Sequence, residues 1–129
     1  MLDADLTPEN IDYVCAHGTG TKANDAMEVI SIKTALGKRA YEIPVSSLKR
    51  LHGHALGGSS AIELIVSLLG ARRGIVPGTL NLRTPAPKCD LDHVAGGPRP
   101  YRYQTFLNQS FGFGGQNAVL AIRATEVTP

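Results

Sequence analysis

The sequence predicts an α/β fold in which helices cover a mixed β-sheet. In its first half, short apolar segments alternate with longer segments of helical periodicity, a pattern typical of parallel strands joined by helices. Near its end, apolar segments 105–109 and 118–122 flank the glycine-rich segment 110–117, which predicts an antiparallel hairpin with a long loop. The expected order is β-α-β-α-loop-β-β, in a single domain over residues 1–129.

The first strand is predicted over residues 11–16 and the first helix over residues 24–36. The apolar residues of the helix recur at roughly helical spacing. Asp25 and Glu28 lie in its first turns, where the helix dipole favours anions, and Gly37 is a plausible stop.

A second strand is predicted over residues 43–47, followed by a loop that ends at His54. Residues 57–72 are nearly all apolar or small, so we expect a buried helix with Glu63 as its exception. The proline- and glycine-rich residues 74–100 predict an extended loop with one short strand near 76–80.

The composition is that of an ordinary globular protein, with 43% hydrophobic residues, 19% charged residues and a net charge of +2. Basic residues occur in pairs, 38–39, 49–50 and 72–73, which is typical of solvated helix ends and loops. We therefore expect no nucleic-acid binding. A small basic surface for an acidic protein partner stays possible.

No apolar run approaches the roughly 20 residues of a membrane span, and the acidic N-terminal segment is unlike a signal peptide. Cys15 and Cys89 have neither a metal-binding spacing nor a disulfide framework. Cys15 is expected to be buried in a strand, and Asp90 and Asp92 should raise the pKa of Cys89, so neither predicts a nucleophile. A cytoplasmic setting without membrane contact is expected.

Two histidines stand in equivalent places, each in a glycine-containing loop that follows a strand. Such loops collect functional residues in α/β proteins, and neutral imidazoles of His17 and His54 could donate hydrogen bonds to a developing oxyanion. A structural role for each histidine is the alternative. Lys49 could be a solvated lysine, and Thr19 and Thr21 could bind a ligand or satisfy their own loop. The glycine loops lack the spacing of nucleotide-binding motifs.

Several motifs occur together in order and with matching gaps, and the set resembles the β-ketoacyl-acyl carrier protein synthases of fatty acid and polyketide synthesis. The motifs are 14–21 (VCAHGTGT), 24–28 (NDAME), 46–54 (SSLKRLHGH), 81–82 (NL), 89–92 (CDLD) and 110–118 (SFGFGGQNA). The resemblance implies a thiolase-like half, the C-terminal domain of such an enzyme.

The resemblance also implies site residues. His17 and His54 are likened to the pair that binds the thioester carbonyl of the extender unit and assists its decarboxylation. Lys49 resembles the lysine that organises the site through Glu28, and Asp25 is a second supporting acid.

Thr19 and Thr21 resemble the threonines that contact the phosphopantetheine arm. Phe113 resembles an aromatic gate and Phe111 neighbours it. The implied reaction is a decarboxylative Claisen condensation with an acyl carrier protein as partner. No metal or resident cofactor is expected, because the phosphopantetheine arrives on the carrier protein.

The sequence departs from the family pattern at Arg50, where serine is usual, and His52 falls at a variable position, so it is not assigned to catalysis. The family's nucleophilic cysteine belongs to the N-terminal half, which is absent here. The chain alone is therefore expected to be an inactive acyltransferase part. It should pair with that half or self-associate, for example as a dimer. The alternatives are a non-catalytic subunit of the chain-length-factor or scaffolding type, and an unrelated α/β binding module.

Overall fold

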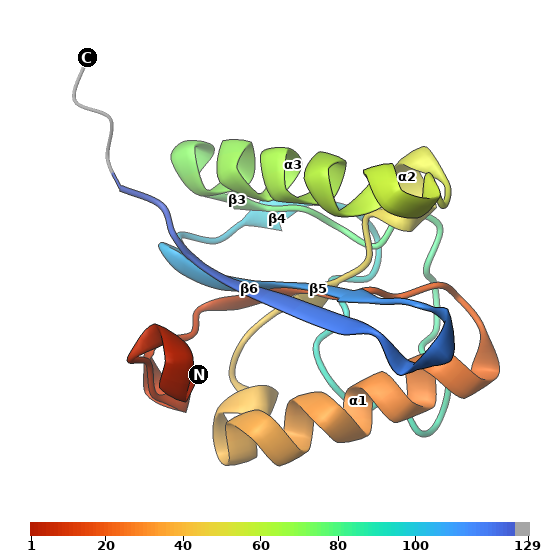
Figure 1. The fold of residues 1–129 in the computed structure, drawn as a ribbon. Coiled ribbons are helices and arrows are strands. Elements are labelled where there is room, and N and C mark those ends of the chain that lie inside the picture. The colour runs from red at the N-terminus through yellow and green to blue at the C-terminus, as the bar shows by residue number, and fades with distance from the viewer. Residues whose placement is uncertain (126–129) are drawn as a thin grey trace.

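The protein is a three-layered α/β/α structure, described here from a computed structural model over residues 1–125. A four-stranded sheet lies between α1 on one face and α3 on the other (Figure 1). In chain order the elements are β1 (Tyr13–Cys15), α1 (Lys22–Leu36), β2 (Val45–Ser46), α2 (Lys49–His52), α3 (Ser59–Arg73), β3 (Ile75–Val76), β4 (Arg99–Pro100), β5 (Thr105–Phe111) and β6 (Asn117–Arg123).

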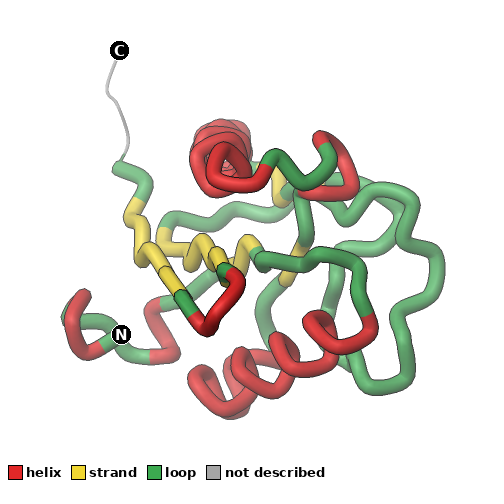
Figure 2. Tube along the Cα trace, turned by 45° about the vertical axis from the view of Figure 1, so that its right-hand side comes forward, coloured by secondary structure: helices red, strands yellow, loops and turns green. Residues whose placement is uncertain are grey.

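The sheet is mixed, as the sequence predicts. Its strand order is β2-β1-β5-β6, and β1 runs parallel to both β2 and β5. The predicted hairpin is confirmed, because β5 and β6 pair antiparallel along their whole length. The tube view of Figure 2 shows the strands between the helices, with the long loop running beside them.

Strand β1 is fully buried because both faces of the sheet are covered at this point. Its residues alternate between two cores, as successive side chains of a strand must. Val14 packs with α1 residues such as Val29 and Ile32, whereas Tyr13 packs with Phe106 beneath α3. Burial on both faces explains why the segment reads as a continuous apolar run instead of an alternating one.

Helix α3 is not buried in the way that its composition predicts. Its fully buried residues are polar, namely Ser59, Glu63 and Ser67, spaced one turn apart, and its apolar residues that pack against the core (Leu64, Val66, Leu68 and Ala71) are only partly buried. Ile62, Ile65 and Leu69 are instead exposed, with Ile65 at 57% accessibility. The prediction of a helix buried on all sides is therefore wrong for this chain, because an apolar face of α3 lacks a covering layer.

The segment between α3 and β5 is the predicted extended loop, bounded by the short antiparallel pair β3 and β4. The strand expected near 76–80 is confined to β3, while α2 and β4 lie where no element was predicted. Two turns of the loop touch at Gly78, where a Cβ atom would lie 2.2 Å from the carbonyl carbon of Gly97. Within residues 1–125, no helix has the length and apolarity needed to cross a bilayer.

Candidate functional site

The backbone of the loop that follows β1 is hydrogen-bonded to the side chain of Glu28 on α1. The carboxylate accepts hydrogen bonds from the backbone N–H of His17 at 2.7 Å and from that of Gly18 at 2.8 Å. Burial raises the pKa of Glu28, and the two amide donors oppose this shift. Gly18 has a φ of +46° and a Cβ there would meet Cβ of Ser47 at 2.4 Å, so only glycine fits between the two strand ends.

The structure brings the two predicted histidines together. The imidazole rings of His17 and His54 meet edge to face with centroids 5.6 Å apart. His17 is only 5% exposed, and burial lowers its pKa to about 4, with the charge of Lys49 and the neighbouring His54 adding to the shift. His17 is therefore neutral at physiological pH and presents one N–H donor.

His54 lies at the surface, and its orientation is fixed by two neighbours. The backbone N–H of Leu56 donates to His54 Nδ1 at 3.2 Å, and Oγ of Ser59 lies 3.2 Å from the same nitrogen. Because Nδ1 accepts a hydrogen bond, the proton of the neutral ring is on Nε2. The N–H donor of His54 is thus directed away from the backbone.

Lys49 lies beside the histidines, but its partner is not the one expected. Its Nζ donates to Oε1 of Glu63 at 2.6 Å, and both side chains are almost completely buried. The expectation that Lys49 acts through Glu28 is wrong, because the Glu28 oxygens accept from backbone amides and from Asn24. A buried ammonium needs a buried counter-charge, and α3 supplies it.

Of the other predicted site residues, one aromatic ring contacts His17 and the rest lie nearer the surface. The ring of Phe111 packs against His17 with centroids 5.5 Å apart, whereas Phe113 is 97% exposed on the hairpin loop. The hydroxyls of Thr19 and Thr21 hydrogen-bond to each other at 3.0 Å near the surface. Asp25 accepts from the backbone N–H of Gly20, so it stabilises the same loop.

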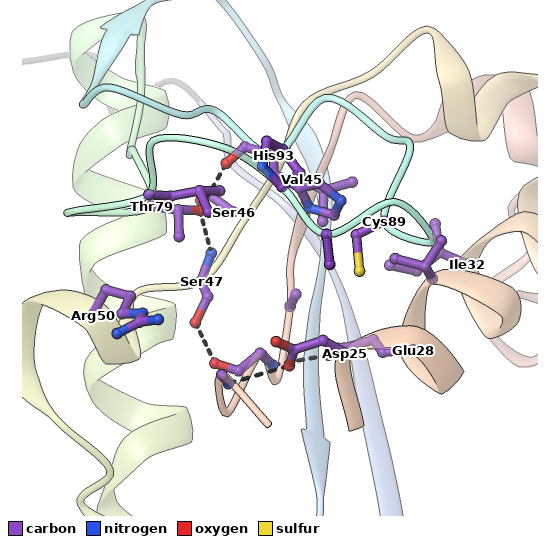
Figure 3. A pocket seen from close by; sticks show the side chains of 17 residues that line it. Asp25, Glu28, Ile32, Val45, Ser46, Ser47, Arg50, Thr79, Cys89 and His93 are labelled. Carbon is purple, nitrogen blue, oxygen red and sulfur yellow. Dashed lines mark hydrogen bonds between the residues drawn. The ribbon is translucent and has the colours of Figure 1, made fainter. Parts of the chain in front are cut away.

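A separate pocket of about 120 Å³ lies behind this loop, between α1, β2 and the long loop (Figure 3). Asp25, Glu28 and Cys89 help to line it, but neither His17 nor His54 does. Burial raises the pKa of Cys89, followed by the charges of Asp25 and Asp90. Asp92 was also expected to raise the pKa of Cys89, but it does not contribute, and its carboxylate pairs with Arg99.

Cys15 is fully buried on β1, as expected, and desolvation raises its pKa to about 12. Such a thiol is inert as a nucleophile. Among residues 1–125, no group of three or more potential ligands could hold a metal ion.

Two residues that sequence reasoning did not assign take part in the site. Glu63 is the counter-ion of Lys49, and Ser59 contacts His54. A single acid within an otherwise apolar helix was a visible signal for Glu63. No comparable signal marked Ser59, because serine is common at helix starts.

The chain is similar to known proteins of one family. The family described as "Beta-ketoacyl synthase, C-terminal domain" matches residues 1–83. Nodulation protein E of Rhizobium leguminosarum bv. trifolii is 46% identical over 95% of the chain, and 3-oxoacyl-[acyl-carrier-protein] synthase 2 of a Synechocystis strain is 48% identical over the same share. The chain covers 30% of the length of each of these two relatives.

A solved structure of a type II polyketide synthase ketosynthase in complex with its acyl carrier protein has the same fold. It superposes with a TM-score of 0.92 at 39% identity, over 97% of this chain and 31% of that one. The family match extends over more than half of the chain and includes His17, Lys49 and His54. The chain therefore belongs to the β-ketoacyl synthase family and carries its C-terminal domain.

Proposed function

We propose that this domain supplies the decarboxylation centre of a β-ketoacyl-acyl carrier protein synthase. The observation that supports this proposal most directly is the contact between the two imidazoles. His17 is neutral, and a hydrogen bond to Nδ1 of His54 places the proton of its neutral form on Nε2. Two N–H donors side by side suit a thioester oxygen that gains negative charge during a reaction.

The reaction that these donors fit is a decarboxylative Claisen condensation. The bond between the malonyl carboxylate and the α-carbon breaks, carbon dioxide leaves, and the electron pair passes to an enolate whose oxygen faces the imidazoles. The enolate carbon then attacks the carbonyl of an acyl thioester, and the thiolate of that ester leaves. The acyl-carrying cysteine belongs to the part of the synthase that precedes this domain.

The substrates would arrive on the phosphopantetheine arm of an acyl carrier protein. Thr19 and Thr21 lie at the exposed end of the loop that carries His17, where their hydroxyls can meet an amide of such an arm. Phe111 lies against His17, and the exposed Phe113 lies two residues further along the same hairpin, so this pair suits a movable aromatic wall. We expect a cytoplasmic enzyme that needs no resident cofactor.

The missing layer over α3 gives the most direct indication of a protein partner. Ile62, Ile65 and Leu69 on α3 and the edge strand β6 expose apolar surface, including Val119 and Leu120. Apolar side chains that are exposed together on one helix face, as on α3, are typical of an interface. The chain has only about a third of the length of its relatives, so the occupant that fits is the cysteine-bearing N-terminal half.

The test is to mix this chain with a cysteine-bearing N-terminal half and to follow β-ketoacyl product from acyl- and malonyl-carrier protein. The proposal requires product from the mixture and none from either part alone. A mixture that forms a folded complex but makes no product would favour the non-catalytic subunit instead. Retention of His17 and His54 together with Lys49 favours the catalytic outcome, because a scaffolding subunit has no chemical use for the two imidazoles.

A further inference from the structure

Helix α2 is a single turn that directs two side chains at one carboxylate of α3. Lys49 and His52 are three residues apart and therefore share a helix face. Nζ of Lys49 donates to Oε1 of Glu63 at 2.6 Å, and Nε2 of His52 lies 3.7 Å from the same oxygen. The side chain of His52 is 14% exposed and that of Glu63 is fully buried, so both lie within the fold.

The contact leaves polar atoms without partners inside the described residues 1–125. Oε2 of Glu63 and both ring nitrogens of His52 are buried and make no hydrogen bond there. An imidazole N–H and a carboxylate that are both buried lose solvation, and pairing them removes that loss. A movement of the ring by about 1 Å would bring Nε2 within hydrogen-bond distance of Glu63.

The charges beside His52 are already paired with each other. Lys49 on its own helix and Glu63 on α3 already form a balanced pair, and Arg50 of α2 is turned to the surface. A second cation would unbalance this buried pair. A neutral ring with its proton on Nε2 donates to the carboxylate without adding charge.

The position of His52 also links it to the reacting groups. It lies two residues before His54, and the charge of Lys49 contributes to the low pKa of His17. If His52 also binds the Glu63 carboxylate, that carboxylate has one orientation and fixes the position of the Lys49 ammonium. Residues that bind the partner of a functional group commonly orient it in this way.

We propose that His52 is a positioning residue of the condensation, which donates its Nε2–H to Glu63 and so fixes the carboxylate that orients Lys49. The inference rests on the proposed function for its catalytic consequence. The contact itself concerns the chain alone. The family resemblance leaves this position variable, so the role belongs to the histidine present here.

The contact is tested first in the natural chain by ¹⁵N nuclear magnetic resonance of the imidazoles. His52 should be the Nε2–H tautomer at neutral pH, and Glu63→Gln should shift its ring nitrogens while leaving those of His93 unchanged. A ring protonated on Nδ1, or one whose signals ignore Glu63→Gln, would overturn the proposal. This result does not depend on any activity.

The consequence is tested by carbon dioxide release from malonyl-carrier protein in the mixture with the N-terminal half. His52→Leu should lower kcat about tenfold with little change in KM, the size typical of lost positioning. His52→Gln keeps an N–H donor and should restore most of the rate, and His93→Gln on the long loop is the control. Equal rates for the Leu and Gln variants would contradict the role. An inactive natural mixture would instead contradict the proposed function, with the imidazole spectra still deciding the contact.

Discussion

The imidazole of His17 meets that of His54 edge to face, with ring centroids 5.6 Å apart, although the two residues come from different loops. The approach depends on two supports from separate layers. Glu28 of α1 holds the backbone at His17, and Ser59 at the start of α3 contacts the ring of His54. The site therefore joins both helical layers at the ends of the parallel strands, and each support can be tested separately.

Titration of His17 should show a midpoint near pH 4, well below its ordinary value of 6.5. Between these values the unfolded chain binds a proton at this residue and the folded chain does not. The contribution of His17 to stability is thus fully present above pH 6.5 and declines as the pH falls toward 4. Imidazole carbon-bound proton shifts, recorded in the folded chain and in concentrated urea, measure both midpoints. A folded midpoint near 6.5 would mean that the ring is not desolvated.

Glu28→Gln should destabilise the chain by about 1–3 kcal/mol, because one backbone N–H of the His17 loop loses its acceptor in a buried place. Urea unfolding followed by circular dichroism measures the change. Glu42→Gln is the matched control, since Glu42 is exposed and pairs with Arg39 at the surface. Similar costs for both variants would show that Glu28 does not support the loop.

Lys49→Met should cost about 3–5 kcal/mol of unfolding free energy, because it leaves the fully buried Glu63 without a counter-charge. Adding Glu63→Gln to Lys49→Met should recover about 2 kcal/mol through the lost coupling. The surface pair of Lys33 and Asp90 supplies the control, and Lys33→Met should cost less than about 1 kcal/mol. Additive effects of the two substitutions at 49 and 63 would argue against the ion pair.

Ile65→Lys should reduce self-association of the isolated chain without loss of stability, because Ile65 is exposed on the uncovered face of α3. Sedimentation velocity over a range of concentrations measures the association. Ile30→Lys is the control, since Ile30 is similarly exposed but lies on α1, across the sheet. A natural chain that stays monomeric at high concentration would remove the basis for this interface.

The strand and helix order could be predicted because each segment carries its own period of apolar residues. The pairing of side chains from different layers could not be predicted in this way. Glu28 and Glu63 are both acids on helices near glycine loops, and only the packing of α2 against α3 shows that Lys49 pairs with the latter. The composition of α3 predicts burial, but it does not tell which of its faces the rest of the chain covers.

Phe111 and Phe113 illustrate the same limit at the site. Both lie in one glycine-rich motif two residues apart, and the sequence could not tell which ring faces the histidines. Phe111 is still in β5 and points toward His17, whereas Phe113 has passed into the turn and is exposed. Strand alternation ends at the turn, so period-based reasoning ends there too.

The most direct test of the paired imidazoles is carbon dioxide release from malonyl-carrier protein, measured for this chain mixed with a cysteine-bearing N-terminal half. The step needs no acyl acceptor, so it isolates the enolate that the imidazoles are proposed to stabilise. His54→Ala should lower the rate by about 10²–10³, the effect of removing one preorganised donor at a developing oxyanion. An unchanged rate in the His54→Ala mixture would show that the imidazole pair is not the decarboxylation centre.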